Sequence, residues 1–338
     1  MLTKVCDPTP EALREAADLL KKGCLVAFPT ETVDGLGADA LNAEAVLRIF
    51  EAKNRPADNP LIVHIWDKSQ LDALCEPTPV ALRLMDAFWP GPLTVLCRKK
   101  PIVPDTVTAG LPTVGMRMPS HPVAYELLRV SGVPVAAPSA NLSTRPSPTT
   151  AAHVFEDMNG RIPMILDGGA CDFGVESTVL DASGEIPVIL RPGAVTREMV
   201  ANLVGACVVA DSVMRPLAEG ESAPSPGMKH RHYAPKGRLT IFRGASEAVA
   251  DAINRACTED ENTVILALTP HLDRYAGRHV MDMGATQLEA ARRLFACLRE
   301  ADDLGYTRLL AEAVSEEEVG LAVMNRMARA AAFDVQDV

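Results

Sequence analysis

Hydroxyl, carboxylate and glycine residues crowd into one short segment, PTETVDGLG at residues 29–37, directly after the apolar run 25–28. Such a segment could hold a small polar ligand through its hydroxyl and carboxylate groups. A structural explanation serves equally well, because Thr and Asp cap helices and Gly permits a positive φ at a strand-to-helix turn. Taken alone, the segment leaves a ligand site and a plain turn both open.

Two cations, Lys53 and Arg55, end an expected amphipathic helix that must stop before Pro56. Basic residues at a helix C-terminus complement the helix dipole by roughly 0.3–1 kcal/mol, so their presence does not require a ligand. The chain then continues through Asn59 and His64 as a rigid polar connection into the next strand. That continuation favours a site that could hold a polyanion.

A second polar segment, PSANLSTRPSPT at residues 138–149, follows the apolar run 133–137. Its Ser139 hydroxyl and Asn141 amide could donate hydrogen bonds to a ligand. A turn followed by a Ser/Thr cap for a helix over 151–155 explains the same pattern. Both interpretations stay open at this point.

Isolated arginines and hydroxyls mark other expected strands. Arg117 lies in the strand expected at 113–118, where a lone Arg is more often a surface or ion-pair residue. Ser177 and Arg191 stand at the ends of two further expected strands. Each of these signals is weak by itself.

The missing motifs narrow the chemistry. The sequence has no G-x-S-x-G elbow, no Walker A loop and no Cys/His nucleophile arrangement, so covalent catalysis has no evident candidate. What the segments share is cations, hydroxyls and amides. That set suits transfer at a phosphorus centre, where positioning and charge neutralisation do most of the catalytic work.

These residues must be positioned by a folded α/β protein. The 338 residues suffice for two domains, since single cores rarely grow beyond about 250 residues. Only 14 residues are aromatic, so aliphatic side chains must fill the core, as in the buried sheets of α/β proteins. Residues 1–210 alternate amphipathic helices, the first over 11–22, with apolar strands. The strands are expected at 25–28, 61–65, 93–96, 113–118, 133–137, 164–166, 177–181 and 188–191.

Residues 211–237 separate this domain from a smaller one. They carry four prolines with Gly and Ser and little periodicity, which predicts a linker. Its dense cationic and aromatic patch, GMKHRHYAP, contains His230 and His232 but no further metal ligand nearby, so a metal site is not expected. Residues 238–338 predict a small Rossmann-like α/β domain without a G-x-G-x-x-G loop, hence without a nucleotide site of its own.

Strands of that smaller domain are expected at 238–243, 263–268, 279–283 and 308–313, and helices at 287–301 and 321–332.

Charge and cysteine usage exclude several protein classes. The formal net charge is −11, and no Lys/Arg block forms a phosphate-binding stripe, which disfavours stable nucleic-acid binding. The eight cysteines show no C-x-x-C pair and no zinc spacing, so they are expected to be reduced thiols. Neither a signal pattern nor an apolar run of about 18 residues is present, which predicts no membrane span and a cytoplasmic protein.

Together and in this order, the motifs resemble the threonylcarbamoyl-AMP synthase family in its long form. The matching stretches are PTETVDGLG, KNRPADNPLIVH, the Arg of VGMRMP, PSANLSTRPSPT, VESTVLD with ILRPG, and PGMKHRHYAP. The resemblance implies a twisted YrdC-like α/β catalytic domain and a second, smaller Rossmann-like domain. It also implies a linker that folds over the active site as a lid.

The implied activity joins L-threonine, bicarbonate and ATP into threonylcarbamoyl-AMP and pyrophosphate, for the N6-threonylcarbamoyladenosine modification of tRNA. Mg²⁺ is expected on the ATP phosphates, with no protein side chain as a metal ligand. A separate tRNA-modifying transferase would receive the product. By position, threonine would contact Thr32, His64, Arg117, Ala137 and Ser177. The nucleotide would be surrounded by Lys53, Arg55, Asn59, Thr113, Ser139, Asn141, Ser147, Arg191 and Tyr233.

The resemblance assigns catalysis to four of these residues. Lys53 and Arg55 would neutralise the triphosphate and the departing pyrophosphate, while Ser139 and Asn141 would donate to the reacting oxygens. Three positions depart from the family pattern: Asp34 replaces a usual Tyr, Thr144 a common Gly, and His230 a frequent Tyr. Asp34 is expected to weaken or alter substrate binding, because a carboxylate repels a triphosphate.

Two alternatives stay open. One is a carbamoyl-adenylate-forming enzyme of the hydrogenase-maturation type, although the chain lacks the length and C-x-x-C pairs of those assemblies. The other is an RNA-binding module that uses a cationic cleft, which the net charge of −11 disfavours.

Overall fold

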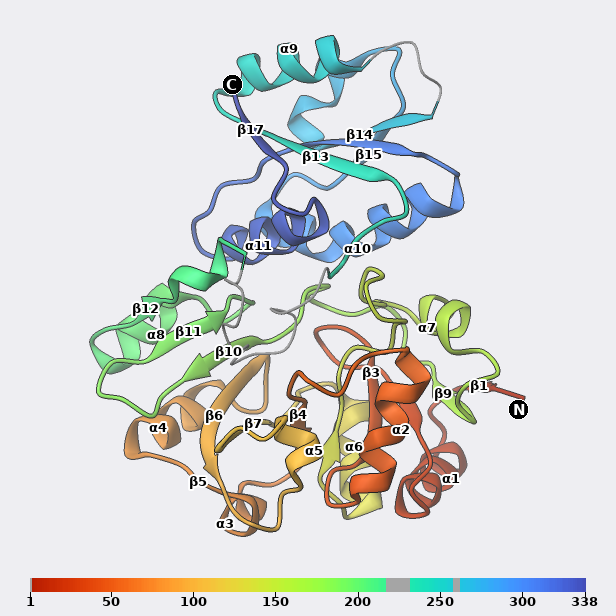
Figure 1. Ribbon diagram of the computed structural model, residues 1–338, viewed down its shortest axis with the longest axis vertical. Coiled ribbons are helices and arrows are strands. Elements are labelled where there is room, and N and C mark those ends of the chain that lie inside the picture. The colour runs from red at the N-terminus through yellow and green to blue at the C-terminus, as the bar shows by residue number, and fades with distance from the viewer. Residues whose placement is uncertain (1, 217–231, 258–261) are drawn as a thin grey trace. The chain divides into compact units, whose positions relative to one another are not determined.

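A computed structural model describes residues 2–216, 232–257 and 262–338. Its described residues form two compact units (Figure 1). The first unit holds residues 2–143 and 147–213, and the second holds 144–146, 214–216, 232–257 and 262–338. Part of the predicted linker at 211–237, residues 217–231 with His230 among them, lies outside the described residues.

A mixed 12-stranded sheet forms the framework of the first unit. In spatial order its strands are β1 (Lys4–Cys6), β9 (Met164–Leu166), β2 (Val26–Phe28), β3 (Gly35–Asp39), β8 (Val135–Ala136), β4 (Ile62–His64), β7 (Thr113–Arg117), β6 (Leu93–Lys99), β10 (Thr178–Asp181), β11 (Val188–Arg191) and β12 (Val208–Val209). The twelfth strand, β5 (Cys75–Glu76), pairs with β6. The sheet contains both parallel pairs, such as β4 with β7, and antiparallel ones, such as β6 with β7.

Side-chain caps begin most helices of this unit. The helices are α1 (Pro10–Lys21), α2 (Ala43–Lys53), α3 (Leu71–Leu74), α4 (Pro79–Phe88), α5 (Asp105–Thr108), α6 (Pro122–Ser131), α7 (Ala151–Met158) and α8 (Arg197–Val204). Each of Thr9, Asn42, Thr78, Thr150 and Thr196 accepts a hydrogen bond from a backbone N–H of the first turn it precedes. Those N–H groups have no partner inside the helix, so the caps fix where the helices begin.

Two cores lie on opposite faces of the sheet. Helices α1 and α6 pack on β2, β8 and β9 through residues that include Leu20, Phe28 and Val135. The opposite face packs against α2 and α4 through the larger core, which continues across the sheet with Val63, Met116 and Val95. Because successive strand residues alternate in direction, the neighbours of these three residues point to the first face. That face carries the candidate site.

The strand-to-helix turn, one of the two interpretations left open for residues 29–37, does not form. After Phe28 the chain does not turn into a helix but returns as β3, which pairs antiparallel with β2 and β8. Gly37 is needed there, because a Cβ at this position would lie 2.8 Å from side-chain atoms of both Phe28 and Val135. The polar residues 29–34 therefore form the connection between two neighbouring strands.

The second unit is a smaller α/β domain, as predicted. Its five strands are all parallel, in the order β15 (Val280–Asp282), β14 (Thr263–Ala267), β16 (Arg308–Glu312), β13 (Arg238–Arg243) and β17 (Val335–Asp337). Helix α9 (Ser246–Ala256) covers one face, and α10 (Gln287–Asp303) and α11 (Gly320–Ala330) lie on the other (Figure 1). A 3₁₀ segment, η3 (Thr269–Tyr275), follows β14. The layers agree with the predicted Rossmann-like fold.

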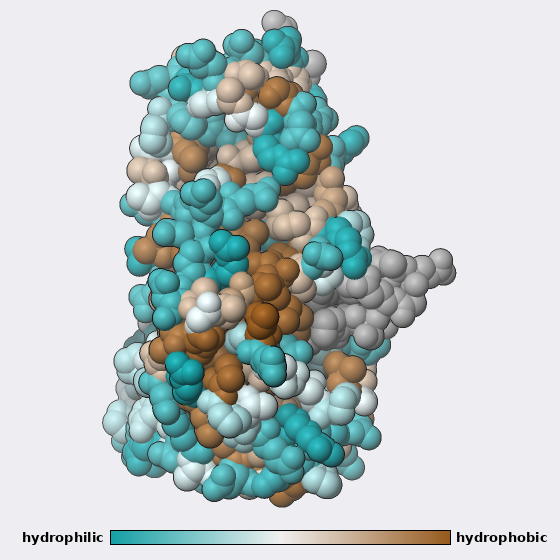
Figure 2. All heavy atoms as spheres, turned by 90° about the vertical axis from the view of Figure 1, so that its left-hand side faces the viewer, coloured by the Kyte–Doolittle hydropathy of each residue, from teal (hydrophilic) through white to brown (hydrophobic). Residues whose placement is uncertain are grey.

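Within the described part of the chain, no helix is long and apolar enough to cross a membrane. One face of the molecule shows mostly hydrophilic residues, with hydrophobic ones grouped between them (Figure 2). Large exposed hydrophobic side chains, such as Leu2, Ile102 and Leu304, are spread along the sequence. Exposed residues of this kind are ordinary on folded proteins and identify no partner surface.

Candidate active site

Polar side chains form a row across neighbouring strands on the first face of the sheet. His64 of β4 pairs in register with Arg117 of β7, which pairs in turn with Thr94 of β6. Thr94 continues the row to Ser177, whose Oγ lies 2.8 Å from the Thr94 Oγ1. The sheet therefore brings together residues that are far apart in the sequence.

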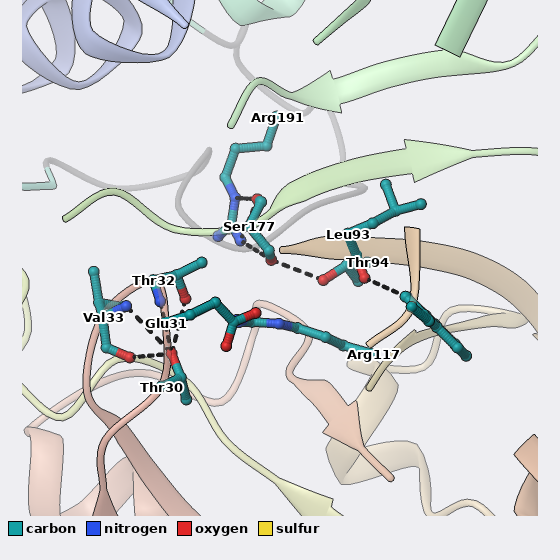
Figure 3. Close-up of polar contacts among 10 residues, drawn as sticks. Thr30, Glu31, Thr32, Val33, Leu93, Thr94, Arg117, Ser177 and Arg191 are labelled. Atoms are coloured by element: carbon teal, nitrogen blue, oxygen red, sulfur yellow. Dashed lines mark hydrogen bonds and ion pairs between the residues drawn. The ribbon is translucent and has the colours of Figure 1, made fainter. Parts of the chain in front are cut away.

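Arg117 is held by a carboxylate that the sequence did not single out. Its Nη2 lies 2.7 Å from Glu31 Oε1, and the two side chains are only 5% and 2% exposed. Figure 3 shows Glu31 reaching toward Arg117 from the polar connection after β2. Glu31 Oε2 and Arg117 Nε have no hydrogen-bond partner among the described residues. Donor and acceptor capacity is thus available to a ligand at this pair.

His64 is buried beside this cation. Burial, reinforced by the charge of Arg117, lowers the pKa of His64 from 6.5 to about 3. Its Nδ1 has no hydrogen-bond partner within the described structure. The imidazole is therefore neutral near pH 7, with one ring nitrogen available to a substrate.

The connection after β2 is fixed by its own hydroxyls. Thr30 Oγ1 donates to the Val33 carbonyl at 2.6 Å and lies 2.9 Å from Thr32 Oγ1 (Figure 3). Because Thr30 has one hydroxyl hydrogen, Thr32 must be the donor between the two hydroxyls. Thr32 thus keeps its oxygen lone pairs as acceptors.

Arg191, at the end of β11, fixes the segment that precedes β10. Its Nε and Nη2 donate to the Ser177 carbonyl at 3.1 and 3.0 Å, and Nη2 also reaches Ser177 Oγ at 3.2 Å. Figure 3 shows this contact continuing to Thr94. Gly193 lets the two segments approach, because a Cβ there would lie 2.4 Å from the Thr178 nitrogen.

Lys53 fixes the second polar segment. Its Nζ donates to the carbonyls of Ser139 and Asn141, at 2.5 and 2.6 Å, and to Asn141 Oδ1 at 3.3 Å. Ser139 Oγ also donates to Asn141 Oδ1, at 2.6 Å. An ammonium group has three donors, so these contacts can occupy all of them. In this arrangement Lys53 orders the segment and contributes its charge.

Arg55 and Asn59 lie in the turn after α2. Arg55 Nη2 donates to the Asn59 carbonyl at 3.0 Å. The Asn59 side chain is fully buried, yet neither its Oδ1 nor its Nδ2 has a hydrogen-bond partner in the described residues. A buried amide without partners is uncommon and points to a ligand that would satisfy it.

Backbone contacts join these segments. Leu36 N donates to the Pro138 carbonyl, Ala140 N to the Asp34 carbonyl and Asp34 N to the Pro148 carbonyl, at 2.8, 2.8 and 3.0 Å. The two polar segments thus lie against each other.

The remaining predicted residues of the first unit, Ala137, Ser147 and Thr113, lie at different distances from the polar row. Ala137 N donates to the Ile62 carbonyl of β4 at 2.9 Å. Ser147 Oγ donates to Glu176 Oε1 at 2.6 Å, next to Ser177. Thr113 shares a face with Arg117 but stands at the opposite end of β7, about 13 Å along the strand. The predicted contacts thus spread along a surface longer than an amino acid.

Tyr233 belongs to the second unit, where it is 5% exposed. Its ring lies 5.1 Å from that of Phe295, and the Arg326 guanidinium lies 5.8 Å from its centroid. Its predicted nucleotide contact stays a prediction.

Buried charges of the first unit balance among the described residues. Four buried cations, Lys53, Arg55, Arg117 and Arg191, accompany four buried carboxylates, Glu31, Asp34, Asp157 and Glu176. Asp34 Oδ1 accepts a hydrogen bond from the Cys171 thiol, at 3.7 Å between the heavy atoms. Burial and this carboxylate raise the pKa of Cys171. The thiol therefore stays protonated.

No group of three or more His, Cys, Asp or Glu residues in the described ranges could hold a metal ion. The site offers fixed cations, hydroxyls and amides. Such groups can bind an anion and stabilise charge that develops at phosphorus.

Comparisons with known proteins place the chain among relatives that match nearly its whole length. Residues 18–193 match a family model described as telomere recombination (Sua5, YciO and YrdC), and residues 195–332 match the threonylcarbamoyl-AMP synthase C-terminal domain. The threonylcarbamoyl-AMP synthase of Pyrococcus abyssi is 44% identical over 96% of this chain and 95% of that protein. That of Bacillus subtilis is 46% identical over 94% and 92%. The crystal structure of P. abyssi Sua5 complexed with L-threonine is similar with a TM-score of 0.88 and 42% identity, covering 100% of this chain and 99% of that one.

Proposed function

The chain belongs to the threonylcarbamoyl-AMP synthase family, and we propose that the polar row and the Lys53-ordered segment of its first unit form the site of this synthesis. The enzyme makes threonylcarbamoyl-AMP from L-threonine and ATP. The observation that carries the site assignment is the continuous row His64, Arg117, Thr94, Ser177 and Arg191, which mixes fixed cations with hydroxyls.

We propose bicarbonate as the third substrate. The threonine amino group and bicarbonate would give an N-carboxylate and water. An oxygen of this N-carboxylate then attacks the α-phosphorus of ATP, and the bond to pyrophosphate breaks. No covalent enzyme intermediate is needed, so the protein has to align two anions and offset their repulsion.

Threonine recognition is assigned to Thr32, His64, Arg117, Ala137 and Ser177. Arg117 supplies a cation for the substrate carboxylate, and Glu31 orients its guanidinium. Thr32 keeps acceptor lone pairs, and neutral His64 has Nδ1 available. These groups match the charges and hydrogen-bonding groups of an amino acid.

Nucleotide recognition is assigned to Lys53, Arg55, Asn59, Thr113, Ser139, Asn141, Ser147, Arg191 and Tyr233. Thr113 and Arg117 share one face of β7, about 13 Å apart, a span that suits a nucleotide at one end and threonine at the other. Asn59 offers a buried donor and acceptor, a pair that matches the edge of adenine. To donate to a reacting oxygen, Ser139 must release the hydrogen bond that it gives to Asn141.

Mg²⁺ is proposed to arrive on the ATP phosphates. The site fits this role, because Glu31, Glu176 and Asp34 already accept hydrogen bonds from protein groups, and the described residues contain no metal-binding group of three or more His, Cys, Asp or Glu. When bound, Mg²⁺ supplies charge neutralisation on the leaving pyrophosphate. The protein groups orient the substrates.

A separate transferase is proposed to carry the threonylcarbamoyl group to tRNA. The net charge of −11 supports this division of labour, since no tRNA footprint is evident in the sequence. All eight cysteines are free thiols, as a reducing cytoplasm favours. We propose a cytoplasmic enzyme on that ground.

The test is pyrophosphate release with ATP, Mg²⁺, L-threonine and bicarbonate, omitting each in turn, with mass spectrometry of the nucleotide product. We expect release only with the complete mixture, together with a threonylcarbamoyl-AMP mass. Arg191→Met should lower the rate at least about tenfold. Its matched control is Arg197→Met, which removes a cation that is 55% exposed and pairs with Glu198. Equal rates in the two variants would refute the site assignment.

A further inference from the structure

The second unit places a serine, a histidine and a glutamate at the same edge of its parallel sheet. Ser246 begins α9 directly after the turn that follows β13, His271 lies in η3 after β14, and Glu312 ends β16. These strands are neighbours in the order β14, β16, β13, and all run the same way. The carboxyl ends of parallel strands are where α/β proteins build ligand sites.

Hydrogen bonds connect the three side chains in a line. Ser246 Oγ lies 3.2 Å from His271 Nε2, and His271 Nδ1 lies 2.9 Å from Glu312 Oε2. An ionised carboxylate only accepts, so a proton on Nδ1 is donated to Glu312 and leaves Nε2 as an acceptor in neutral imidazole. The Ser246 hydroxyl can then donate to Nε2, as a nucleophile donates to a general base.

Glu312 is firmly held at the end of this line. Its side chain is 4% exposed, and it accepts from the Tyr275 hydroxyl at 2.7 Å and from Leu268 N at 3.1 Å. Burial and the hydrogen bond to Glu312 raise the pKa of Tyr275, so its hydroxyl stays protonated and keeps donating. With these donors in place, Glu312 can orient His271 without shifting itself.

Two features could stabilise negative charge next to Ser246. Arg274 Nη1 donates to the Ser246 Oγ, which accepts this bond while its hydrogen faces His271. Ser246 is also the first residue of α9, and in the described structure no side chain caps the first turn of that helix. Its leading N–H groups have no partner inside the helix and can donate to an oxyanion.

A pocket of about 310 Å³ adjoins the line, and Ser246, His271 and Glu312 lie in its wall. Val249, Ala313 and Val314 supply an apolar side. Arg243 also lines the pocket, but it already pairs with Asp337 at 2.6 Å and with Glu316 at 3.1 Å. Because these two carboxylates neutralise Arg243, the pocket favours a small uncharged acyl group over an anion.

We propose that Ser246, His271 and Glu312 form a second catalytic site, which hydrolyses small uncharged carboxylic esters or thioesters. Ser246 Oγ attacks the carbonyl carbon, and its proton passes to His271 Nε2. The bond to the alcohol or thiol breaks, and that leaving group takes the proton from Nε2. Water, again deprotonated by His271, releases the carboxylic acid and restores the serine.

Hydrolysis of 4-nitrophenyl acetate by the full chain tests the proposal, together with labelling by a fluorophosphonate and peptide mapping. We expect one adduct per chain, on Ser246. Ser246→Ala and His271→Ala should each lose the label and lower hydrolysis roughly 100-fold. Glu312 is a positioning residue, so Glu312→Gln should lower kcat while leaving KM nearly unchanged.

The matched control is Ser315→Ala, because Ser315 lines the same pocket. It should keep both the label and the hydrolysis rate, and Ser246→Ala should keep threonylcarbamoyl-AMP formation. An adduct on another residue, or equal hydrolysis by Ser246→Ala and the unmodified chain, would overturn the second site. Since that readout is independent of pyrophosphate release, it leaves the synthase assignment untouched.

Discussion

Asn59 is expected to lower the stability of the fold while it contributes to ATP binding, and both effects can be measured. Its amide is fully buried without hydrogen-bond partners in the described structure, so the fold bears a desolvation cost. Asn59→Leu keeps the approximate size of the side chain and should raise the free energy of unfolding by about 1 kcal/mol. The same change should raise the KM for ATP about tenfold or more, because the proposed donor and acceptor are lost.

Thr108→Val is the matched control for Asn59→Leu. The Thr108 Oγ1 is also buried without a partner in the described residues, but it has no proposed ligand. This variant should gain stability in urea unfolding and leave the KM for ATP unchanged. Equal KM values for Asn59→Leu and the unmodified chain would remove Asn59 from the nucleotide site.

His64 makes stability depend on pH. Its pKa is lowered to about 3 in the folded chain, while the unfolded side chain titrates near 6.5. Between these values the unfolded state binds more protons, so this contribution to stability is present above pH 6.5 and is lost as the pH falls toward 3. His64→Gln should reduce the slope of the unfolding free energy against pH in this window by about 1.4 kcal/mol per pH unit. Parallel curves for the two proteins would contradict the burial argument.

Asp34 is the departure from the family pattern that bears on substrate binding. It is buried within the site, and its Oδ1 accepts from Cys171. Asp34→Asn removes the charge while keeping the size and an acceptor oxygen, whereas the Tyr usual in the family needs more room. We expect a severalfold rise in kcat/KM for ATP, from reduced repulsion of the triphosphate. Asp39→Asn should have no such effect, and an unchanged or lower value for Asp34→Asn would refute the hypothesis.

Among the elements, the close approach of the segment after β11 to the segment before β10 depends on the absence of a side chain at Gly193. A Cβ there would lie 2.4 Å from Thr178 N and 2.7 Å from the Glu176 carbonyl, so backbone must move. Gly193→Ala should lower the free energy of unfolding by more than about 1 kcal/mol and displace Ser177. Synthase activity should fall with it. The matched control is Gly184→Ala, in the turn between β10 and β11, where an added Cβ has nothing within 4 Å; it should change neither thermal unfolding nor activity.

Periodicity predicted most of the elements, and the exceptions have a physical reason. The strands at 164–166, 188–191 and 238–243 agree with the structure to the residue. Strand β3, with sequence GLGAD, was missed because it contains two glycines and no β-branched residue. It forms because β2 and β8 pair with it on either side, which is tertiary information. Short edge strands such as β12 were missed for lack of length.

The site residues, like the secondary-structure elements, were predictable only where the signal is local in the sequence. The resemblance of the motifs to a family predicted site residues in the first unit, but Glu31 was missed, since a partner for Arg117 can be found only once β2 and β7 are placed. Ser246, His271 and Glu312 lie 25 and 41 residues apart in sequence and form no known motif. Gly244-Ala245-Ser246, between an expected strand and a helix, was the available signal. It went unnoticed because Ala248 stands where G-x-S-x-G requires a glycine.

At the scale of the whole molecule, domain boundaries are not simple ranges. Residues 144–146 group with the second unit, although in sequence they lie between Asn141 and Ser147. Thr144 adopts a φ of 77°, in a region that favours the glycine common in the family at this position. Periodicity could suggest only a continuous first domain at 1–210. Residues 144–146 are assigned to the second unit by contacts with residues distant in sequence, and local periodicity carries no information about such contacts.

The net charge of the whole chain leads to a prediction about tRNA binding. A chain with a net charge of −11 repels a polyanion at long range, and tight binding would require a local group of cations that neutralises phosphates. Fluorescence anisotropy of labelled tRNA should therefore show no saturable binding between about 50 and 200 mM salt. A known tRNA-binding protein serves as the positive control. Saturable binding with a steep salt dependence would mean that the enzyme meets tRNA itself, and the proposed transfer of the adenylate to a separate transferase would then have to be abandoned.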